Sequence, residues 1–178
     1  MSLKAPNFKI FVVILAYNAQ KTIKNVIEDI PSEWVDKIVI SDDDSTDKTY
    51  SVSKTISDVI AIKNKNNLHM GGNQKVVYNY ALENNADIVV VLHGDNQYDA
   101  SKIPEMIKPI INSETDVVIG SRIMGGMALE GGMPRYKYLG NHFLNFIQNT
   151  AFKLKLSDYA TGYKAYSRRV LTSIPYLK

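Results

Sequence analysis

Asp95 is the residue in this chain best placed to do chemistry. It lies in the polar segment HGDNQ of residues 93–97, which directly follows an apolar run at residues 88–92. A continuous β-branched run with polar bounds is typical of a strand buried on both faces of a parallel sheet. Ligands of such sheets bind beyond the carboxyl ends of the strands, so we expect Asp95 to project into a crevice there. Gly94 would let another group approach closely.

Two further polar clusters follow predicted strands. Tyr17 and Asn18 follow the first apolar run, and the acidic turn with Asp42, Asp43 and Asp44 follows the second. Because the carboxyl ends of parallel strands share one edge, we expect all three clusters to converge on one crevice. Each cluster alone could simply form a turn or cap a helix. Their joint placement favours a binding site.

Carboxylates at this edge suit the release of a nucleoside diphosphate. When a sugar leaves such a donor, the diphosphate gains negative charge, which Mg²⁺ or Mn²⁺ can stabilise while held by one or two carboxylates and the phosphates. We therefore interpret Asp95 as a metal ligand. Asp42 or Asp43 would accept hydrogen bonds from a base or ribose, as acids that follow strands do in other nucleotide folds.

The elements that must position these residues alternate regularly. Apolar runs typical of strands are separated by patterns with helical spacing, which indicates repeated βαβ units and a mostly parallel sheet flanked by helices. The predicted strands are residues 9–16, 37–40, 59–63, 88–92 and 116–120, and the predicted helices are residues 22–30, 46–57, a segment opened by Gly71 and Gly72, and 103–111. Residues 121–137 then form a long glycine-containing loop, which is usually functional. A helix at 138–156 and a last strand or extended segment at 158–169 follow.

Composition limits the possible classes of protein. The 178 residues are 45% hydrophobic and 22% charged, so we expect one core and a single domain. The net charge of +3 is mild and the lysines are dispersed, so nothing points to nucleic acid. The absence of cysteine excludes a disulfide framework and thiolate metal sites, and fits a cytoplasmic protein. No apolar run approaches the roughly 18 residues that span a bilayer. We expect residues 1–7 to be a tag or disordered.

Three segments together resemble the family 2 inverting glycosyltransferases with the Rossmann-like A fold. They are FVVILAYNAQKT at residues 11–22, ISDDDSTDKT at 40–49 and LHGDNQY at 92–98. The similarity is strongest to the branch of dolichol or polyprenyl phosphate mannosyl- and glucosyltransferases, and it runs from about residue 8 to the end of the chain. Family members often continue further, so the resemblance implies a catalytic domain truncated at its C-terminus.

The resemblance also implies roles for individual residues. Asp95 would be a metal ligand with Gln97 close by, and Asp158, in the segment DYATGYK, would be a general base or would position the acceptor. A phosphate acceptor is already an anion and needs no strong base. Arg122, Arg135 and Lys137 would meet phosphates of the donor or lipid acceptor, Arg122 as part of the catalytic site, although basic residues in a loop are often simply solvated. Lys164, in the segment DYATGYK, would lie near the acceptor phosphate. The nucleoside pocket would be lined by Ala16, Tyr17, Asn18, Asp42 or Asp43, Gly71, His93 and Gly94.

The sequence departs from the family pattern at two positions. His93 stands where the first acid of the usual Asp-x-Asp would be, and imidazole is a poorer ligand for Mg²⁺ than for softer ions. His93 could instead contact the ribose, or simply end the strand. Asp44 replaces the glycine of the usual Asp-Asp-Gly-Ser, and aspartate tolerates left-handed backbone better than most residues.

We therefore expect a metal-dependent inverting transferase of cell envelope glycan biosynthesis. It would move a sugar from a UDP- or GDP-sugar to an acceptor such as a polyprenyl or dolichyl phosphate, at the inner face of the membrane. One alternative is a non-catalytic nucleotide-sugar-binding module of the same fold, which His93 and the early end of the chain suggest. Another is an NAD(P)-dependent oxidoreductase, although the turn after the first strand contains no glycine. The donor base, the sugar, the acceptor and the oligomeric state stay open.

Overall fold

The structure is a computed structural model that describes residues 8–121 and 134–176. The described residues form two compact units. The first comprises residues 8–118 and 164–176, and the second comprises residues 119–121 and 134–163. The prediction of a single catalytic domain stays a prediction.

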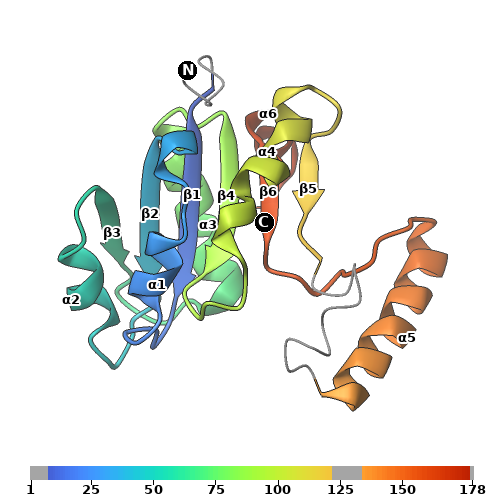
Figure 1. Cartoon of the computed structure of the whole chain (residues 1–178), viewed down its shortest axis with the longest axis horizontal. Coiled ribbons are helices and arrows are strands. Elements are labelled where there is room, and N and C mark those ends of the chain that lie inside the picture. The colour runs from blue at the N-terminus through green and yellow to red at the C-terminus, as the bar shows by residue number, and fades with distance from the viewer. Residues whose placement is uncertain (1–7, 122–133, 177–178) are drawn as a thin grey trace. The chain divides into compact units, whose positions relative to one another are not determined.

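A six-stranded sheet forms the centre of the first unit, with the strand order β3-β2-β1-β4-β6-β5 (Figure 1). β1 pairs in parallel with β2 and β4, and β2 pairs in parallel with β3. β6 runs antiparallel to β4. The expected α/β fold with a mostly parallel sheet is therefore confirmed. The strands are β1 (Ile10–Ala16), β2 (Lys37–Asp42), β3 (Val59–Lys63), β4 (Ile88–His93), β5 (Val117–Ile119) and β6 (Lys164–Ser167).

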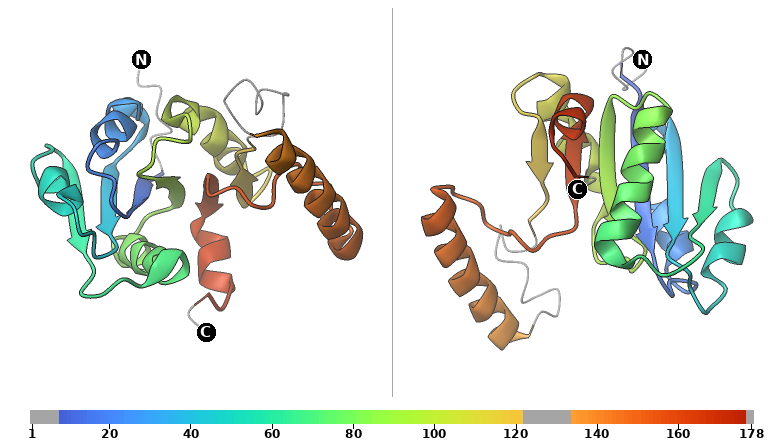
Figure 2. Two further views of the ribbon diagram at one scale, coloured as in Figure 1. Left: turned by 90° about the horizontal axis from the view of Figure 1, so that it is seen from below. Right: turned by 180° about the vertical axis from the view of Figure 1, so that it is seen from behind.

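Helices cover both faces of this sheet. α3 and α6 lie on one face, and α1 and α4 lie on the other (Figure 2, left). Odd-numbered residues of β1, such as Phe11 and Val13, pack in one buried cluster with Val77 and Ala81 of α3. The α-helices are α1 (Ile23–Glu28), α2 (Thr49–Lys54), α3 (His69–Glu83), α4 (Ile103–Ile111), α5 (Arg135–Phe152) and α6 (Arg168–Ser173), with short 3₁₀ turns η1 (Ser32–Trp34) and η2 (Ala100–Lys102).

The register of the central strands brings their carboxyl ends level. Ala16 of β1 is paired with Asp42 of β2, and Leu15 of β1 is paired with His93 of β4. Every residue of β1 is buried, as a central strand with helices on both faces requires. The turns after β1, β2 and β4 therefore begin at the same edge of the sheet, as the sequence predicts.

Several elements differ in extent from the predicted ones. α3 begins at His69, so Gly71 lies within its first turn instead of opening it. α5 begins at Arg135, directly after Pro134, and includes residues that the sequence assigned to the long loop. Of the extended segment predicted at residues 158–169, only β6 is a strand, and α6 follows it at once. Residues 122–133 of the long loop lie outside the described residues.

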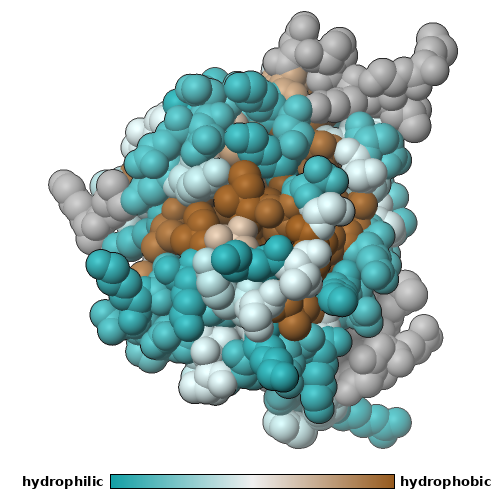
Figure 3. Space-filling view, turned by 90° about the vertical axis from the view of Figure 1, so that its left-hand side faces the viewer, coloured by the Kyte–Doolittle hydropathy of each residue, from teal (hydrophilic) through white to brown (hydrophobic). Residues whose placement is uncertain are grey.

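β3 forms one edge of the sheet, and Figure 3 views the molecule from this side. Hydrophobic side chains gather near the middle of this face, and hydrophilic side chains surround them. Residues 59–62 of β3 are half-buried, and Ile60 and Ile62 pack against the core. The strand ends in the exposed Lys63, whose Nζ lies 3.8 Å from Asp44 Oδ1. A short edge strand that ends in a charge is poorly suited to pairing with another chain.

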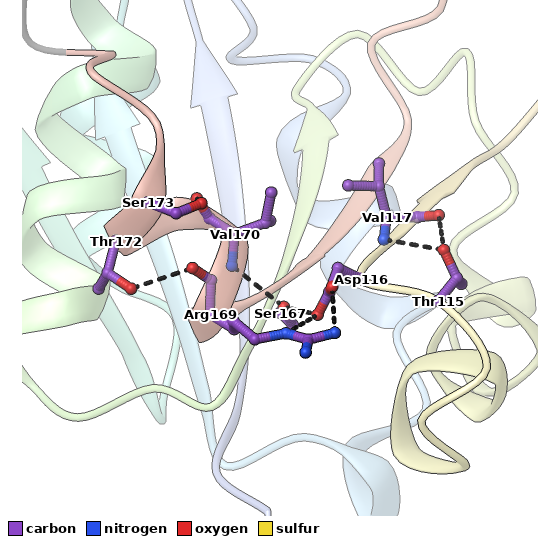
Figure 4. A network of polar contacts seen from close by, with 8 residues as sticks. All are labelled: Thr115, Asp116, Val117, Ser167, Arg169, Val170, Thr172 and Ser173. Atoms are coloured by element: carbon purple, nitrogen blue, oxygen red, sulfur yellow. Dashed lines mark hydrogen bonds and ion pairs between the residues drawn. The ribbon is translucent and has the colours of Figure 1, made fainter.

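An ion pair joins the start of β5 to the start of α6 (Figure 4). Arg169 donates to both carboxylate oxygens of Asp116, and Ser167 Oγ donates to Asp116 Oδ1 at 2.6 Å. Ser167 Oγ also caps α6 by accepting from Val170 N at 3.3 Å. The Arg169 guanidinium and the Ser167 hydroxyl hold the pKa of the Asp116 carboxyl below its ordinary value of 3.8.

Substitution Asp116→Asn should therefore lower the melting temperature slightly at neutral pH. A lowered folded-state pKa stabilises the fold above the unfolded-state pKa, and this contribution is lost as the pH falls through the folded-state value. The difference in melting temperature between wild type and Asp116→Asn should thus shrink below about pH 4. Thermal unfolding of both proteins across this range measures it. A difference that stays constant with pH would contradict the assignment.

Candidate nucleotide site

An open cavity of about 320 Å³ lies at the carboxyl ends of β1, β2 and β4. Its volume falls at the lower end of the range for small-molecule sites. It brings together six residues that the sequence predicted for this site, which are Ala16, Tyr17, Asp43, His93, Gly94 and Asp95. The remaining lining residues are Leu15, Ala19, Asn67, His69, Met70 and Asn73.

The turn after β1 presents an aromatic ring and fastens itself to the neighbouring turn. Tyr17 lines the cavity with 53% of its surface exposed. Asn18 has a left-handed backbone with φ of 51°, and its backbone N donates to Ser45 Oγ at 2.8 Å. Asn18 Oδ1 accepts from Thr46 N at 2.9 Å. Asn18, which the resemblance placed in the nucleoside pocket, therefore joins the turns after β1 and β2 and is not among the lining residues.

The structure separates the two candidate acids after β2. Asp43 is 4% exposed and lines the cavity, whereas Asp42 is fully buried and is not a lining residue. Asp42 Oδ2 instead accepts from Ser45 N, at 3.3 Å, within the turn. Asp44 has a φ of 59°, the left-handed backbone that glycine adopts most easily. Asp43 is thus the acid that a bound nucleotide could reach directly.

Hydrogen bonds hold Asp43 in place. Its backbone N donates to Ala16 O at 2.9 Å. Its carboxylate oxygen Oδ1 accepts from Leu68 N at 2.9 Å and from Asn64 Nδ2 at 2.8 Å. The Asp43 carboxylate therefore ties the end of β2 to the loop between β3 and α3.

Gly94 allows the turn after β4 to pack closely against the turn after β1. Its N donates to Leu15 O at 2.9 Å, and a Cβ at this position would lie 3.1 Å from Ala19 Cβ and 3.3 Å from Ala16 Cβ. These separations are tighter than ordinary contacts between side chains. Gly94 therefore permits close packing between the two turns, and its predicted role at the nucleotide stays a prediction.

Asp95 extends from this turn into solvent at the cavity. Its Oδ1 accepts from Gln97 N at 3.2 Å. Gln97 is exposed and is not a lining residue. His93 is half-buried, and its ring lies edge-on to Tyr98 with 5.6 Å between the ring centroids. The cavity thus has an imidazole and a carboxylate at the end of β4.

The sequence did not identify the wall formed by the β3–α3 loop and the first turn of α3. Asn67, His69, Met70 and Asn73 line the cavity from this wall. His69 has a φ of 58°, and its N donates to Asn67 Oδ1 at 2.9 Å. Gly71, which was predicted to contact the nucleotide, is exposed and is not a lining residue. The group of asparagines before α3 is the sequence feature that could have revealed this wall, because asparagine side chains often form hydrogen bonds with loop backbone.

The cavity can accept a divalent cation that arrives with a nucleotide. Apart from the bond to Gln97 N, Asp95 makes no hydrogen bond within the described residues, so Oδ2 is available as a ligand. In residues 8–121 and 134–176, no cluster of three or more His, Asp or Glu side chains is placed to hold an ion. Mg²⁺ sites commonly use one or two carboxylates and complete the shell with substrate phosphates and water. The Asp95 carboxylate therefore fits an ion that takes most of its ligands from phosphates and water. It does not fit a site in which all the ligands come from the protein.

Comparison with known proteins identifies the family. The family model described as Glycosyl transferase family 2 matches residues 11–174. The chain belongs to glycosyl transferase family 2. A relative from Methanococcus voltae, named UDP-N-acetylglucosamine--dolichyl-phosphate N-acetylglucosaminyltransferase, is 34% identical over 91% of this chain and 70% of its own length. The dolichol-phosphate mannosyltransferase of Pyrococcus furiosus is 26% identical over 93% of this chain and 48% of its own length.

Solved structures confirm the fold of this family 2 member. Glucosyl-3-phosphoglycerate synthase from Mycobacterium tuberculosis, crystallised with Mn²⁺, uridine diphosphate and phosphoglyceric acid, matches with a TM-score of 0.70 and 22% identity. The match covers 95% of this chain and 59% of that protein. The chain therefore spans between about half and 70% of the length of these three proteins. Membership of family 2 contradicts the alternative of an NAD(P)-dependent oxidoreductase.

The residues that the family resemblance assigns to the acceptor are only partly described. Asp158 lies in the second unit and is 1% exposed, with Oδ1 accepting from Ala160 N at 3.1 Å. Arg135 is the exposed first residue of α5, and Lys164 is the half-buried first residue of β6. Arg122 lies outside the described residues. Their predicted roles toward the acceptor stay predictions.

Two asparagines of α5 hold the segment that contains Asp158. Asn145 Nδ2 donates to Ser157 O at 2.5 Å, and Asn145 Oδ1 accepts from Tyr159 N at 3.3 Å. Asn149 Oδ1 accepts from Leu156 N at 2.8 Å and from Tyr159 Oη at 3.0 Å. The second unit thus fixes the backbone on both sides of Asp158 from within.

Proposed function

We propose that this glycosyltransferase moves a sugar from a UDP-sugar to a polyprenyl or dolichyl phosphate, with inversion and with Mg²⁺ or Mn²⁺. The observation that carries the proposal is that Asp43 and Asp95 line the same cavity. Support for the donor and acceptor comes from the name of the Methanococcus voltae relative, and support for the ion comes from the Mn²⁺ and UDP in the mycobacterial structure.

In this proposal different residues around the cavity bind different parts of the donor. The half-exposed Tyr17 ring offers a surface on which a base can stack, and Asp43 accepts a hydrogen bond from the base. Asp95 would hold a divalent cation, and that cation would supply positive charge to stabilise the diphosphate leaving group. His93 stands where a second acid would be and places an imidazole beside Asp95 at the cavity.

The acceptor side needs little acid-base chemistry if the acceptor is a phosphate. An anionic phosphate oxygen can attack the sugar directly, so positioning matters more than proton removal. In this view Arg122, Arg135 and Lys164 attract the acceptor phosphate, since guanidinium and ammonium groups bind phosphate well. Asp158 keeps its predicted role as the acceptor-side carboxylate, either as a base or by positioning the acceptor.

A binding panel tests the proposed donor. The melting temperature of the purified chain should rise with UDP in the presence of Mn²⁺ or Mg²⁺, and rise less with UDP alone, because a ligand that binds only the folded form stabilises it. GDP and NAD should cause smaller shifts. A larger rise in melting temperature with GDP than with UDP would overturn the choice of UDP. If UDP binds but no sugar transfer to polyprenyl phosphate is detected, the result would favour the non-catalytic alternative that His93 suggests.

We also propose that the protein works at the inner membrane surface and contacts it through α5. Among the helices described, none combines the length and apolarity needed to cross a bilayer. α5 instead exposes large apolar side chains at helical spacing, including Leu139, Phe143 and Phe146. Residues 135–155 carry four Lys or Arg residues and no Asp or Glu. An apolar face with basic residues and without acids favours an anionic lipid surface.

The double substitution Phe143→Ala and Phe146→Ala should weaken binding to anionic vesicles. Each exposed phenylalanine that inserts into lipid contributes about 1.5–3 kcal/mol, so the pair should change the partition coefficient more than tenfold. Sedimentation with phosphatidylglycerol-containing vesicles measures this coefficient. Ile174→Ala, which shortens an exposed apolar side chain elsewhere, should have no effect. Equal sedimentation of the double variant and the wild type would contradict the membrane contact.

A further inference from the structure

A buried chain of amide groups leads from the core to the carboxylate of Asp43. Asn73 is 2% exposed, and its Nδ2 donates to Ser41 O at 3.1 Å. Asn73 Oδ1 accepts from Asn64 Nδ2 at 3.1 Å, and the same Asn64 nitrogen donates to Asp43 Oδ1 at 2.8 Å. Asn64 is 7% exposed, and its backbone N donates to Asp42 O at 2.9 Å. The chain thus connects α3, the end of β3 and the end of β2.

These contacts fix the orientation of both amides. Asn64 Nδ2 lies between two acceptor oxygens, so a flipped Asn64 amide would place its own oxygen against both of them. Asn73 offers its nitrogen to Ser41 and its oxygen to Asn64, so it cannot flip without losing both bonds. Because each amide takes part in two of these hydrogen bonds, both side chains are held in place.

The network also fixes which oxygen of Asp43 is available. Oδ1 is occupied by Asn64 Nδ2 and Leu68 N. Within the described residues Oδ2 has no hydrogen-bond partner, and Asp43 is a lining residue of the cavity. A carboxylate with one oxygen occupied by two donors cannot rotate freely, so Oδ2 keeps one direction.

We propose that Asn64 and Asn73 are positioning residues for recognition of the donor base. They hold Asp43 so that Oδ2 accepts the imide N–H of a pyrimidine such as uracil. This inference rests on the proposed function of the cavity as a UDP-sugar site. Cytosine presents a ring-nitrogen acceptor at the same position, and a carboxylate there would repel it. Asn64 therefore affects base specificity through Asp43, without contacting the base itself.

A methylated ligand tests this inference. N3-methyl-UDP lacks the imide hydrogen, so its affinity relative to UDP reports on the bond to Asp43. Hydrogen bonds to a charged group contribute enough that wild type should bind UDP at least about tenfold more tightly than N3-methyl-UDP. In Asn64→Ala this ratio should fall to about threefold or less, because Asp43 can turn away. A purely structural loss would lower both affinities by the same factor and keep the ratio.

The control and the second variant decide the outcome. Asn66→Ala alters an exposed asparagine of the same loop and should keep the wild-type ratio. If Asn64→Ala does not fold, Asn73→Ser replaces it, since that variant removes the anchor of Asn64 and should also lower the ratio. An unchanged ratio in the folded variant, or equal binding of both ligands by wild type, would overturn the positioning role. Failure of wild type to bind UDP at all would overturn the proposed function instead.

Discussion

Replacing Asp95 by alanine should reduce sugar transfer at least about a hundredfold, which is the scale on which losing one group that stabilises developing charge acts. The side chain is exposed, and among residues 8–121 and 134–176 its one hydrogen-bond partner is Gln97 N, at 3.2 Å, so the fold should lose almost nothing. Exposed substitutions of this kind usually change the free energy of unfolding by less than about 0.5 kcal/mol. Steady-state transfer rates and thermal unfolding of the same preparation measure the two effects.

A matched variant shows whether the effect is local. Asp29 is an exposed aspartate at the end of α1, and it does not line the cavity. Asp29→Ala removes the same charge from the surface and should leave the transfer rate unchanged. Similar sugar transfer rates for Asp95→Ala and Asp29→Ala would show that Asp95 does not have the proposed role in transfer.

Substitution of Asp43 should affect binding and stability, and two variants should separate these effects. Asp43→Ala leaves Leu68 N and the Asn64 amide without their acceptor, and each unsatisfied donor costs about 1–3 kcal/mol. The free energy of unfolding should therefore fall by about 2 kcal/mol or more, and UDP affinity should fall with it. Denaturant titration and calorimetric titration with UDP measure the two quantities.

Asp43→Asn keeps an oxygen that can accept from Leu68 N and Asn64. Its new nitrogen would then replace Oδ2 and face the imide N–H of the base, donor against donor. UDP affinity should fall about tenfold or more while most of the stability is retained. Binding of UDP by Asp43→Asn with wild-type affinity would show that this carboxylate does not contact the base.

The strands and their common edge were predictable because burial dictates their composition. β1 and β4 are nearly continuous apolar runs, which are typical of a strand covered on both faces. The polar residues that end these runs therefore had to lie at one edge. Asp44 and Gly94 were predictable for a related reason, since a left-handed turn and a close backbone approach each admit few residue types.

Other features depend on contacts between distant segments and were not predictable. Nothing in the acidic turn shows that β2 continues to Asp42, which buries that residue and leaves Asp43 at the cavity. The wall with Asn67 and His69 has no periodicity, and its position follows from the bond between Leu68 N and Asp43. β6 is four residues long and begins with Lys164, so its antiparallel pairing with β4 is set by tertiary contacts.

The proposal that UDP and a cation share the cavity with Asp43 and Asp95 has one direct test. Crystals of the chain grown with UDP and Mn²⁺ should show an anomalous scattering peak within bonding distance of an Asp95 carboxylate oxygen. In the same crystals the uracil should lie against Asp43. A peak elsewhere on the chain, or UDP bound outside this cavity, would contradict the account.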